Sequence, residues 1–292
     1  MQNMNGDEKS EISGSAFFNW KVIAATAVLL GVLFLLFRPT LLWMNERFFE
    51  EHSYYSHGWL IPPAIAFLLY QRRKIIIGTC PRPSWSGLGI LIPGLLLHIF
   101  ARFFGINFIS GLALPVVIFG LVLTQWGWGR GRYILGPLLL TIFMIPLPGI
   151  WVISIVFHLK IYSASIGVAL GRILGISIIQ NGIEIVLPSA PSGETLTIGD
   201  PCSGLRSLIS FAALGGFFSL LLPLAIPRRV IIFLAAVILA PISNILRVVS
   251  LIVLRQAVGP GILSGPWHIV LGALIFFVCF LLLLQVIRWV LR

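Results

Sequence analysis

The chain has 292 residues, of which 58% are hydrophobic and only 10% are charged. Soluble domains carry about 25% charged residues, so this composition excludes an ordinary soluble enzyme, a disordered tail and a disulfide scaffold, and indicates an integral membrane protein. The net charge of +11 comes from short basic clusters between apolar runs, which is typical of membrane topology signals and argues against nucleic-acid binding.

Eight apolar runs are candidates for helices that cross a hydrocarbon core, which needs about 20 residues per helix. They cover residues 20–37, 58–71, 86–104, 110–126, 133–148, 205–222, 230–254 and 267–291. The first run has no small-residue cleavage site behind it, so we expect a retained anchor. We therefore predict an all-α polytopic membrane protein that forms one domain over residues 1–292, without the repeat of an inverted-repeat transporter.

Basic clusters predict the side of the membrane that each connection faces. They follow the second, fourth, sixth and eighth runs, at residues 72–74, 130–132, 228–229 and 288–292. If the N-terminus is inside, every cluster lies on the cytoplasmic face, as the positive-inside rule requires. We expect both termini, including the tail of residues 1–19, in the cytoplasm of a plasma (inner) membrane protein. The connections 38–57, 105–109, 149–204 and 255–266 then face outward.

The longest outward segment covers residues 149–204. Its first part, residues 151–174, is apolar but contains His158, Lys160 and Arg172, a mixture that favours a helix lying at the membrane interface. Two β-rich runs then flank Asn181-Gly182, which is a strong signal for a hairpin. We expect a small extracytoplasmic β-element before the sixth run.

The motif DPCSGLRS begins at Asp200, directly after this element. Asp200 and Pro201 suit the N-cap and first position of a helix, which would put Cys202 in the first turn at the outer surface, followed by Ser203. A helix N-terminus lowers the pKa of a thiol, and Arg206 would add positive charge from the same helical face. The residues therefore favour a reactive thiolate, the alternative being a small apolar residue packed at a helix start.

Three further polar residues fall at or near the predicted outer surface. Arg247 lies inside the seventh run, three residues after Asn244, and an ionisable group within a span is a functional candidate; the alternative is an arginine that snorkels to the headgroups. His268 opens the eighth run behind Pro266, where a helix N-terminus favours the neutral imidazole; the alternative is an interfacial histidine beside Trp267.

His57 stands in a second polar cluster, Ser53-Tyr54-Tyr55-Ser56-His57-Gly58-Trp59, at the start of the second run. It is an alternative base or a substrate contact, unless the cluster is only an aromatic belt that anchors the span. The three cysteines and five histidines show no metal-ligand spacing, so we expect no metal and no other cofactor.

Cys202, Arg247 and His268 together supply the groups of a cysteine peptidase or transpeptidase, namely a nucleophile, an oxyanion stabiliser and a general acid/base. Two other classes of protein remain open. A flippase for lipid-linked sugars would use Arg247 and His268 as phosphate contacts without needing Cys202, and a membrane scaffold would need none of the three. A plain protease, in which water is the acceptor, would use the same residues.

The chain resembles the exosortase/archaeosortase family of membrane cysteine transpeptidases in five motifs that occur in order. These are YSHGWLIP with QRRK after it, IPLPG, CSGLRS, NILR and the final histidine, which begin at Tyr55, Gln71, Ile145, Cys202, Asn244 and His268. The chain ends at Arg292 without the appended soluble domain of some relatives, which leaves a link to exopolysaccharide production open.

The resemblance implies a reaction and its partners. The substrates would be exported proteins with a C-terminal sorting signal of the PEP-CTERM kind, which is a short motif, a membrane-spanning helix and a basic tail. Cys202 would attack the peptide, Arg247 would stabilise the oxyanion and His268 would act as acid and base. The acyl-enzyme would pass to an unknown acceptor, such as a membrane lipid or glycan anchor, while Arg206 or Arg172 would pair with a glutamate of the motif.

Overall fold

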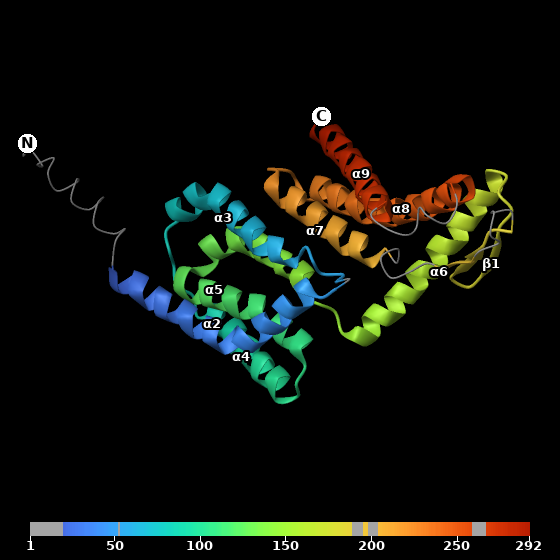
Figure 1. The fold of residues 1–292 in the computed structure, drawn as a ribbon. Coiled ribbons are helices and arrows are strands. Elements are labelled where there is room, and N and C mark those ends of the chain that lie inside the picture. Colours follow the sequence, from blue (N-terminus) through green and yellow to red (C-terminus); the bar gives the residue numbers. More distant parts are fainter. Residues whose placement is uncertain (1–19, 52, 189–194, 198–203, 259–266) are drawn as a thin grey trace, which may run out of the picture. The chain divides into compact units, whose positions relative to one another are not determined.

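The computed structural model describes residues 20–51, 53–188, 195–197, 204–258 and 267–292. The chain divides into two compact units at Trp43, Met1–Trp43 and Met44–Arg292. In chain order the elements are α2 (Trp20–Phe49), η1 (Gly58–Leu60), α3 (Ile61–Gly78), α4 (Ser86–Phe103), α5 (Asn107–Leu139), η2 (Leu140–Met144), α6 (Gly149–Ile173), β1 (Ile179–Asn181), β2 (Glu184–Val186), β3 (Thr195–Thr197), α7 (Leu205–Leu221), α8 (Ile226–Val258) and α9 (Trp267–Leu291) (Figure 1).

Six of the helices in the described part of the chain are long and apolar enough to cross a membrane. They are Val28–Phe49, Ser86–Phe103, Asn107–Met144, Gly149–Ile173, Ile226–Ala257 and Val270–Leu291, and the apolar helix Leu205–Leu221 is shorter. α9 exposes a continuous stripe of Val270, Leu274, Phe277 and Leu281, which a soluble protein would cover. The prediction of an integral membrane protein is confirmed, whereas the predicted count of eight spans is matched only in part.

α5 contains the predicted fourth and fifth runs, and it reverses direction between them. Gly127 has φ 69° and ψ −177°, which is a kink inside α5, and a side chain there would overlap the carbonyl of Arg82. A Cβ on Gly131 would lie 2.5 Å from Cδ2 of Leu123, although residues eight apart in a straight helix are separated by about 12 Å. The second arm of α5 therefore folds back onto the first.

α6 differs from its prediction. The sequence favours an interfacial helix over residues 151–174, but α6 is one helix of 25 residues that has the length and composition of a span. At 1.5 Å per residue it is about 37 Å long, more than the roughly 30 Å hydrocarbon core. The histidine inside it, His158, is accommodated because its Nδ1 contacts the Ser154 carbonyl at 2.8 Å, one turn earlier.

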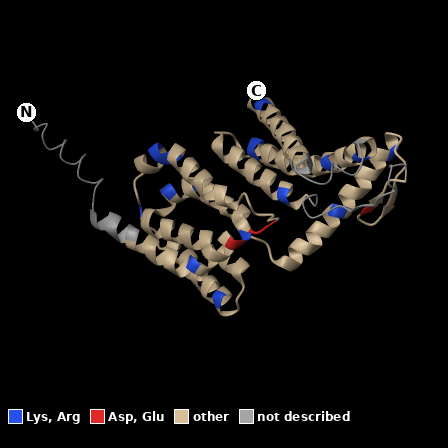
Figure 2. Cartoon of the chain, in the orientation of Figure 1, with Lys and Arg blue, Asp and Glu red and all other residues tan. Residues whose placement is uncertain are grey.

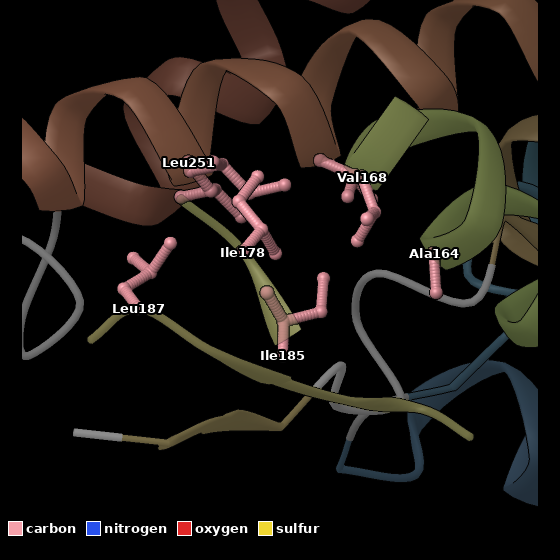
Figure 3. Packing of buried hydrophobic residues seen from close by; sticks show 8 residues of the cluster. Ala164, Val168, Ile178, Ile185, Leu187 and Leu251 are labelled. Carbon is pink, nitrogen blue, oxygen red and sulfur yellow. The ribbon is translucent and has the colours of Figure 1, made fainter. Parts of the chain in front are cut away.

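The β-element forms a three-stranded antiparallel sheet in the order β1-β2-β3. Asn181 pairs with Glu184 across the turn, and Gly182 has φ 63°, so the predicted hairpin at Asn181-Gly182 is confirmed. The sheet is anchored by a buried apolar cluster that joins the β2 region to α6 and α8 (Figure 3). The cluster consists of Ala164, Val168, Ile178, Ile185, Leu187, Val248, Leu251 and Ile252.

Candidate functional site

The predicted nucleophile segment is known here only through its flanks. Asp200, Cys202 and Ser203 lie outside the described residues. His268 is in the first turn of α9, and its side chain also lies outside the described part. The residues on either side of these two positions form the described part of the site.

α7 occupies the predicted sixth run, residues 205–222. α7 begins at Leu205 behind Gly204, which has φ 82° and ψ −12° and stands as the N-cap. Asp200 and Cys202 lie outside the described residues, so the predicted N-cap at Asp200 and the predicted shared face of Cys202 and Arg206 stay predictions.

Gly204 places the end of the Cys202 segment directly on α8. A Cβ on Gly204 would lie 2.9 Å from Nδ2 and 3.0 Å from Cγ of Asn244. The Asn244 side chain is buried, and its Nδ2 donates a hydrogen bond to Ser163 Oγ on α6 at 2.8 Å. Asn244 is thereby held between α6 and the N-cap of α7, and its amide is oriented by a partner 81 positions earlier in the chain.

Arg247 lies one turn further along α8 and contacts α9. A Cβ on Gly272 would be 2.8 Å from Cζ and 3.1 Å from Nη2 of Arg247. The guanidinium therefore packs against the backbone of α9, where only a glycine leaves enough room. His268 precedes Gly272 by four residues on the same helix, and residues at this spacing share a helix face. The backbone positions thus put Arg247 one turn from His268.

His57 is fixed by both of its ring nitrogens. Nε2 contacts the Phe143 carbonyl at 3.2 Å, and Nδ1 contacts Ser210 Oγ on α7 at 3.3 Å. A carbonyl only accepts, so Nε2 carries the proton and Nδ1 accepts from the Ser210 hydroxyl. Burial lowers the pKa of His57, the bond to the Phe143 carbonyl raises it, and the charge of Arg206 lowers it, with a net result below the ordinary value. The ring is therefore neutral at pH 7.

Arg206 lies close enough to both His57 and Arg247 for their charges to interact. Its exposed side chain lies near enough to interact electrostatically with Arg247, with Tyr54 and with His57. Tyr55, next to Tyr54, accepts a hydrogen bond on its hydroxyl from the Leu147 backbone N–H at 3.0 Å. The segments around Tyr55, Leu147, Arg206 and Arg247 therefore meet in one region, although they are far apart in the sequence.

A cavity of about 300 Å³ adjoins this region. One apolar face of α6 lines it together with Tyr54, Ile183 from the hairpin turn and Lys160. The cavity therefore combines apolar walls with an ammonium group, and Tyr54, which lines it, also interacts electrostatically with Arg206. Such a site suits a short peptide segment with an apolar part and a carboxylate.

The structure brings four of the predicted site residues together, namely His57, Arg206, Asn244 and Arg247. Arg172 is engaged elsewhere, since its Nε and Nη2 donate to the Ile178 carbonyl at 3.3 and 2.9 Å. Ser163, Ser210 and Gly272 hold the site but carry no signal in the sequence beyond being small residues on apolar helices. Among the described residues, no group of three His, Cys, Asp or Glu side chains is arranged to hold a metal.

Comparison with protein families matches residues 43–285 to a family described as transmembrane exosortase. The match covers most of the chain and includes every residue of the site, from His57 to Gly272. Comparisons with curated proteins and with solved structures found no match.

Proposed function

Because the chain belongs to the transmembrane exosortase family, a family of membrane cysteine peptidases and transpeptidases, we propose that it cleaves the C-terminal sorting signals of exported proteins and transfers the product to an acceptor. One observation carries this proposal. Gly204 and Gly272 pack on two residues of α8 that are one turn apart, Asn244 and Arg247. Gly204 follows Cys202 by two residues and Gly272 follows His268 by four, so these two contacts support a site in which Cys202 and His268 act beside this part of α8.

The reaction begins when His268 takes the proton of the Cys202 thiol and the resulting thiolate attacks the carbonyl carbon of the scissile peptide bond. The electron pair of the carbonyl moves to oxygen, and the guanidinium of Arg247 stabilises this oxyanion with charge-assisted hydrogen bonds. When the tetrahedral intermediate collapses, the C–N bond breaks and His268 protonates the leaving amine. The product is a thioester between Cys202 and the new C-terminus of the substrate.

The second step releases the thioester. His268 removes a proton from the acceptor nucleophile, which attacks the thioester carbonyl and expels the Cys202 thiolate. An amine or hydroxyl acceptor gives a transfer product, whereas water gives a free carboxylate. The position of Arg247 against α9 supports its role in both steps, because the oxyanion forms twice at the same place.

His57 supports the reaction without exchanging a proton. Both ring nitrogens are occupied by Phe143 and Ser210, so His57 is a positioning residue rather than a base. It joins η2 to α7 one turn after Arg206, and it thereby fixes the start of the helix that follows Cys202.

We propose that the recognition motif of the substrate binds in the cavity beside α6. A glutamate of a Pro-Glu-Pro-like motif would find the cations Lys160 and Arg206, and prolines would contact the apolar wall formed by Val152, Val156 and Phe157. The helix of the signal would then lie in the membrane below the motif. This arrangement would hold the scissile bond at the level of the segment that contains Cys202.

Trapping of the acyl-enzyme tests the proposal. We expect a covalent adduct between Cys202 and a co-expressed substrate that carries a sorting signal, and neutral hydroxylamine should release it because a thioester is the linkage. The Cys202→Ser variant should form no hydroxylamine-sensitive adduct. An adduct that maps to Cys80 or Cys279, or no adduct in a protein that still cleaves the substrate, would contradict the proposal.

A further inference from the structure

A second cationic site lies at the opposite end of α3 and α7 from the candidate site. Arg72 is near the end of α3, where its Nη1 donates to the Tyr133 carbonyl at 2.8 Å and its Nη2 donates to the Leu220 carbonyl at 2.7 Å. Neither carbonyl has a helical partner. Residue 137 is a proline, so it cannot donate to Tyr133, and Leu220 lies in the last turn of α7. Arg72 therefore satisfies two otherwise unpaired carbonyls.

A second arginine brings more positive charge to the same place. The charge of Arg229, in the first turn of α8, acts on Arg72. Arg229 is half-buried, and its Nε is buried without a hydrogen-bond partner in the described structure. The acidic residues that the structure describes are Glu46, Glu50, Glu51 and Glu184, none of which is on α3, α7 or α8 (Figure 2). The charge of this arginine pair is thus unbalanced by the described part of the chain.

An apolar groove of about 240 Å³ begins beside Arg72. One wall comes from the end of α5 and from η2, including Gly136, Leu140 and Phe143, and the other comes from α7 at Gly216 and Leu220. Gly136 connects the groove with the cations, because a Cβ there would lie 3.6 Å from Arg72 Nη1. Glycine also keeps the groove open at its other end, since a Cβ on Gly216 would be 3.0 Å from Leu140 Cδ2.

From this arrangement we propose that Arg72, Arg229 and the groove between α5–η2 and α7 bind one anionic phospholipid. Guanidinium groups recognise phosphate oxygens through paired hydrogen bonds, and the half-buried side chain of Arg229 would supply them from its terminal nitrogens. The adjoining groove accepts the first part of an acyl chain. The basic clusters predict that this end faces the cytoplasm, where the leaflet is rich in anionic lipids. This site is separate from the proposed reaction, and its presence does not depend on it.

Arg228 provides a matched control for Arg229, because it is the neighbouring arginine and carries the same charge but has an exposed side chain. Binding of phosphatidylglycerol and of phosphatidylcholine to the purified full chain is measured by native mass spectrometry for the natural protein, Arg229→Gln and Arg228→Gln. We expect the natural protein to retain one phosphatidylglycerol in preference to phosphatidylcholine. Arg229→Gln should bind it roughly five- to tenfold more weakly, while Arg228→Gln should bind it as the natural protein does.

Four results would overturn the assignment. Equal retention of the two lipids by the natural protein would show that no headgroup is recognised. Equal losses of phosphatidylglycerol binding in Arg229→Gln and Arg228→Gln would show only a general attraction of the lipid to basic residues. Unchanged phosphatidylglycerol binding in Arg229→Gln would show that Arg229 is not part of the site. Displacement of phosphatidylglycerol by inorganic phosphate at the same concentration would show that the site binds an anion and that the acyl chain contributes nothing. Arg72 donates to two backbone carbonyls, whereas the Nε of Arg229 has no hydrogen-bond partner in the described structure. We therefore expect Arg229→Gln to fold, which unchanged thermal unfolding in detergent would verify.

Discussion

The side-chain amide of Asn244 fills the space in which a side chain at Gly204 would stand. The Cβ of such a side chain would lie 2.9 Å from Asn244 Nδ2 and 3.2 Å from Asn244 Cβ. Gly204 also has φ 82°, so backbone conformation and packing both require glycine there. This contact ties the segment that carries Cys202 to the turn of α8 that carries Arg247, and it makes the geometry of the proposed site depend on one small residue.

Gly204→Ala should therefore abolish most of the activity. A left-handed conformation costs a residue with a side chain roughly 1–2 kcal/mol, and the new methyl group would push Asn244 away. Gly175→Ala is the matched control, because Gly175 has φ 83° but no atom within 4 Å of its Cβ position. We expect Gly175→Ala to lose a similar amount of stability while it retains processing of a sorting-signal reporter. Equal activity in the two variants would contradict the importance of the contact with Asn244.

Gly272→Ala should lower the rate of processing with little effect on folding. The methyl group would lie 2.8 Å from Arg247 Cζ, and the guanidinium can move away because it ends a flexible side chain. A displaced oxyanion group should lower kcat on the order of ten- to a hundredfold. Gly89→Ala, in an open position on α4, serves as the control and should leave kcat unchanged. One outcome would contradict this prediction: Gly272→Ala retains full kcat, and a further substitution of Arg247 in that variant abolishes activity. The guanidinium would then not act from its position against Gly272.

Stability should depend on pH through His57. Its pKa in the folded protein is below the ordinary value of 6.5, chiefly because of burial. The unfolded chain therefore binds a proton more readily, and the folded state loses stability as the pH falls below about 6.5. His57→Gln keeps an amide that can donate and accept but cannot titrate. Between pH 7.5 and pH 5.5 the melting temperature in detergent should fall further for the natural protein than for this variant; equal falls would show that His57 is not the responsible group.

The side of the membrane can be tested with two exposed positions. Cys80 is exposed after α3, and Glu184 is exposed on β2; the basic clusters predict that they face opposite sides. A membrane-impermeant maleimide applied to intact cells should label Glu184→Cys in a background of Cys80→Ser and Cys202→Ala. It should not label native Cys80 in the Cys202→Ala background until the cells are permeabilised. The reverse pattern would place the site on the cytoplasmic face.

Local signals predicted several elements correctly, because few residues decide them. The turn at Asn181-Gly182 requires a positive φ that Gly182 provides, and the reversal of α5 occurs near the basic residues that separate two apolar runs. The apolar run of residues 205–222 predicted α7, which begins at Leu205. The local signals at Asp200 and Pro201 lie outside the described residues, whereas the left-handed Gly204 that stands as the N-cap of α7 and packs on Asn244 had no signal in the sequence.

Contacts between distant helices explain what the sequence did not reveal. The bond from Asn244 to Ser163 and the bond from Ser210 to His57 each join residues at least 80 positions apart, so no local pattern marks Ser163 or Ser210. The sequence identified Arg247 because an arginine within an apolar run is costly. It did not identify Gly272, because a glycine in a membrane helix has many uses.

The most direct test compares C-terminal peptides of exported and membrane proteins, by mass spectrometry, from cells with the natural protein and with Cys202→Ala. The proposed function predicts a set of proteins that keep an apolar helix and a basic tail only in the variant. These proteins should share a short motif before the helix, and their C-termini in natural cells should carry the acceptor or a free carboxylate. Identical C-termini in both cells, with the variant present in the membrane at natural amounts, would contradict the function proposed for Cys202.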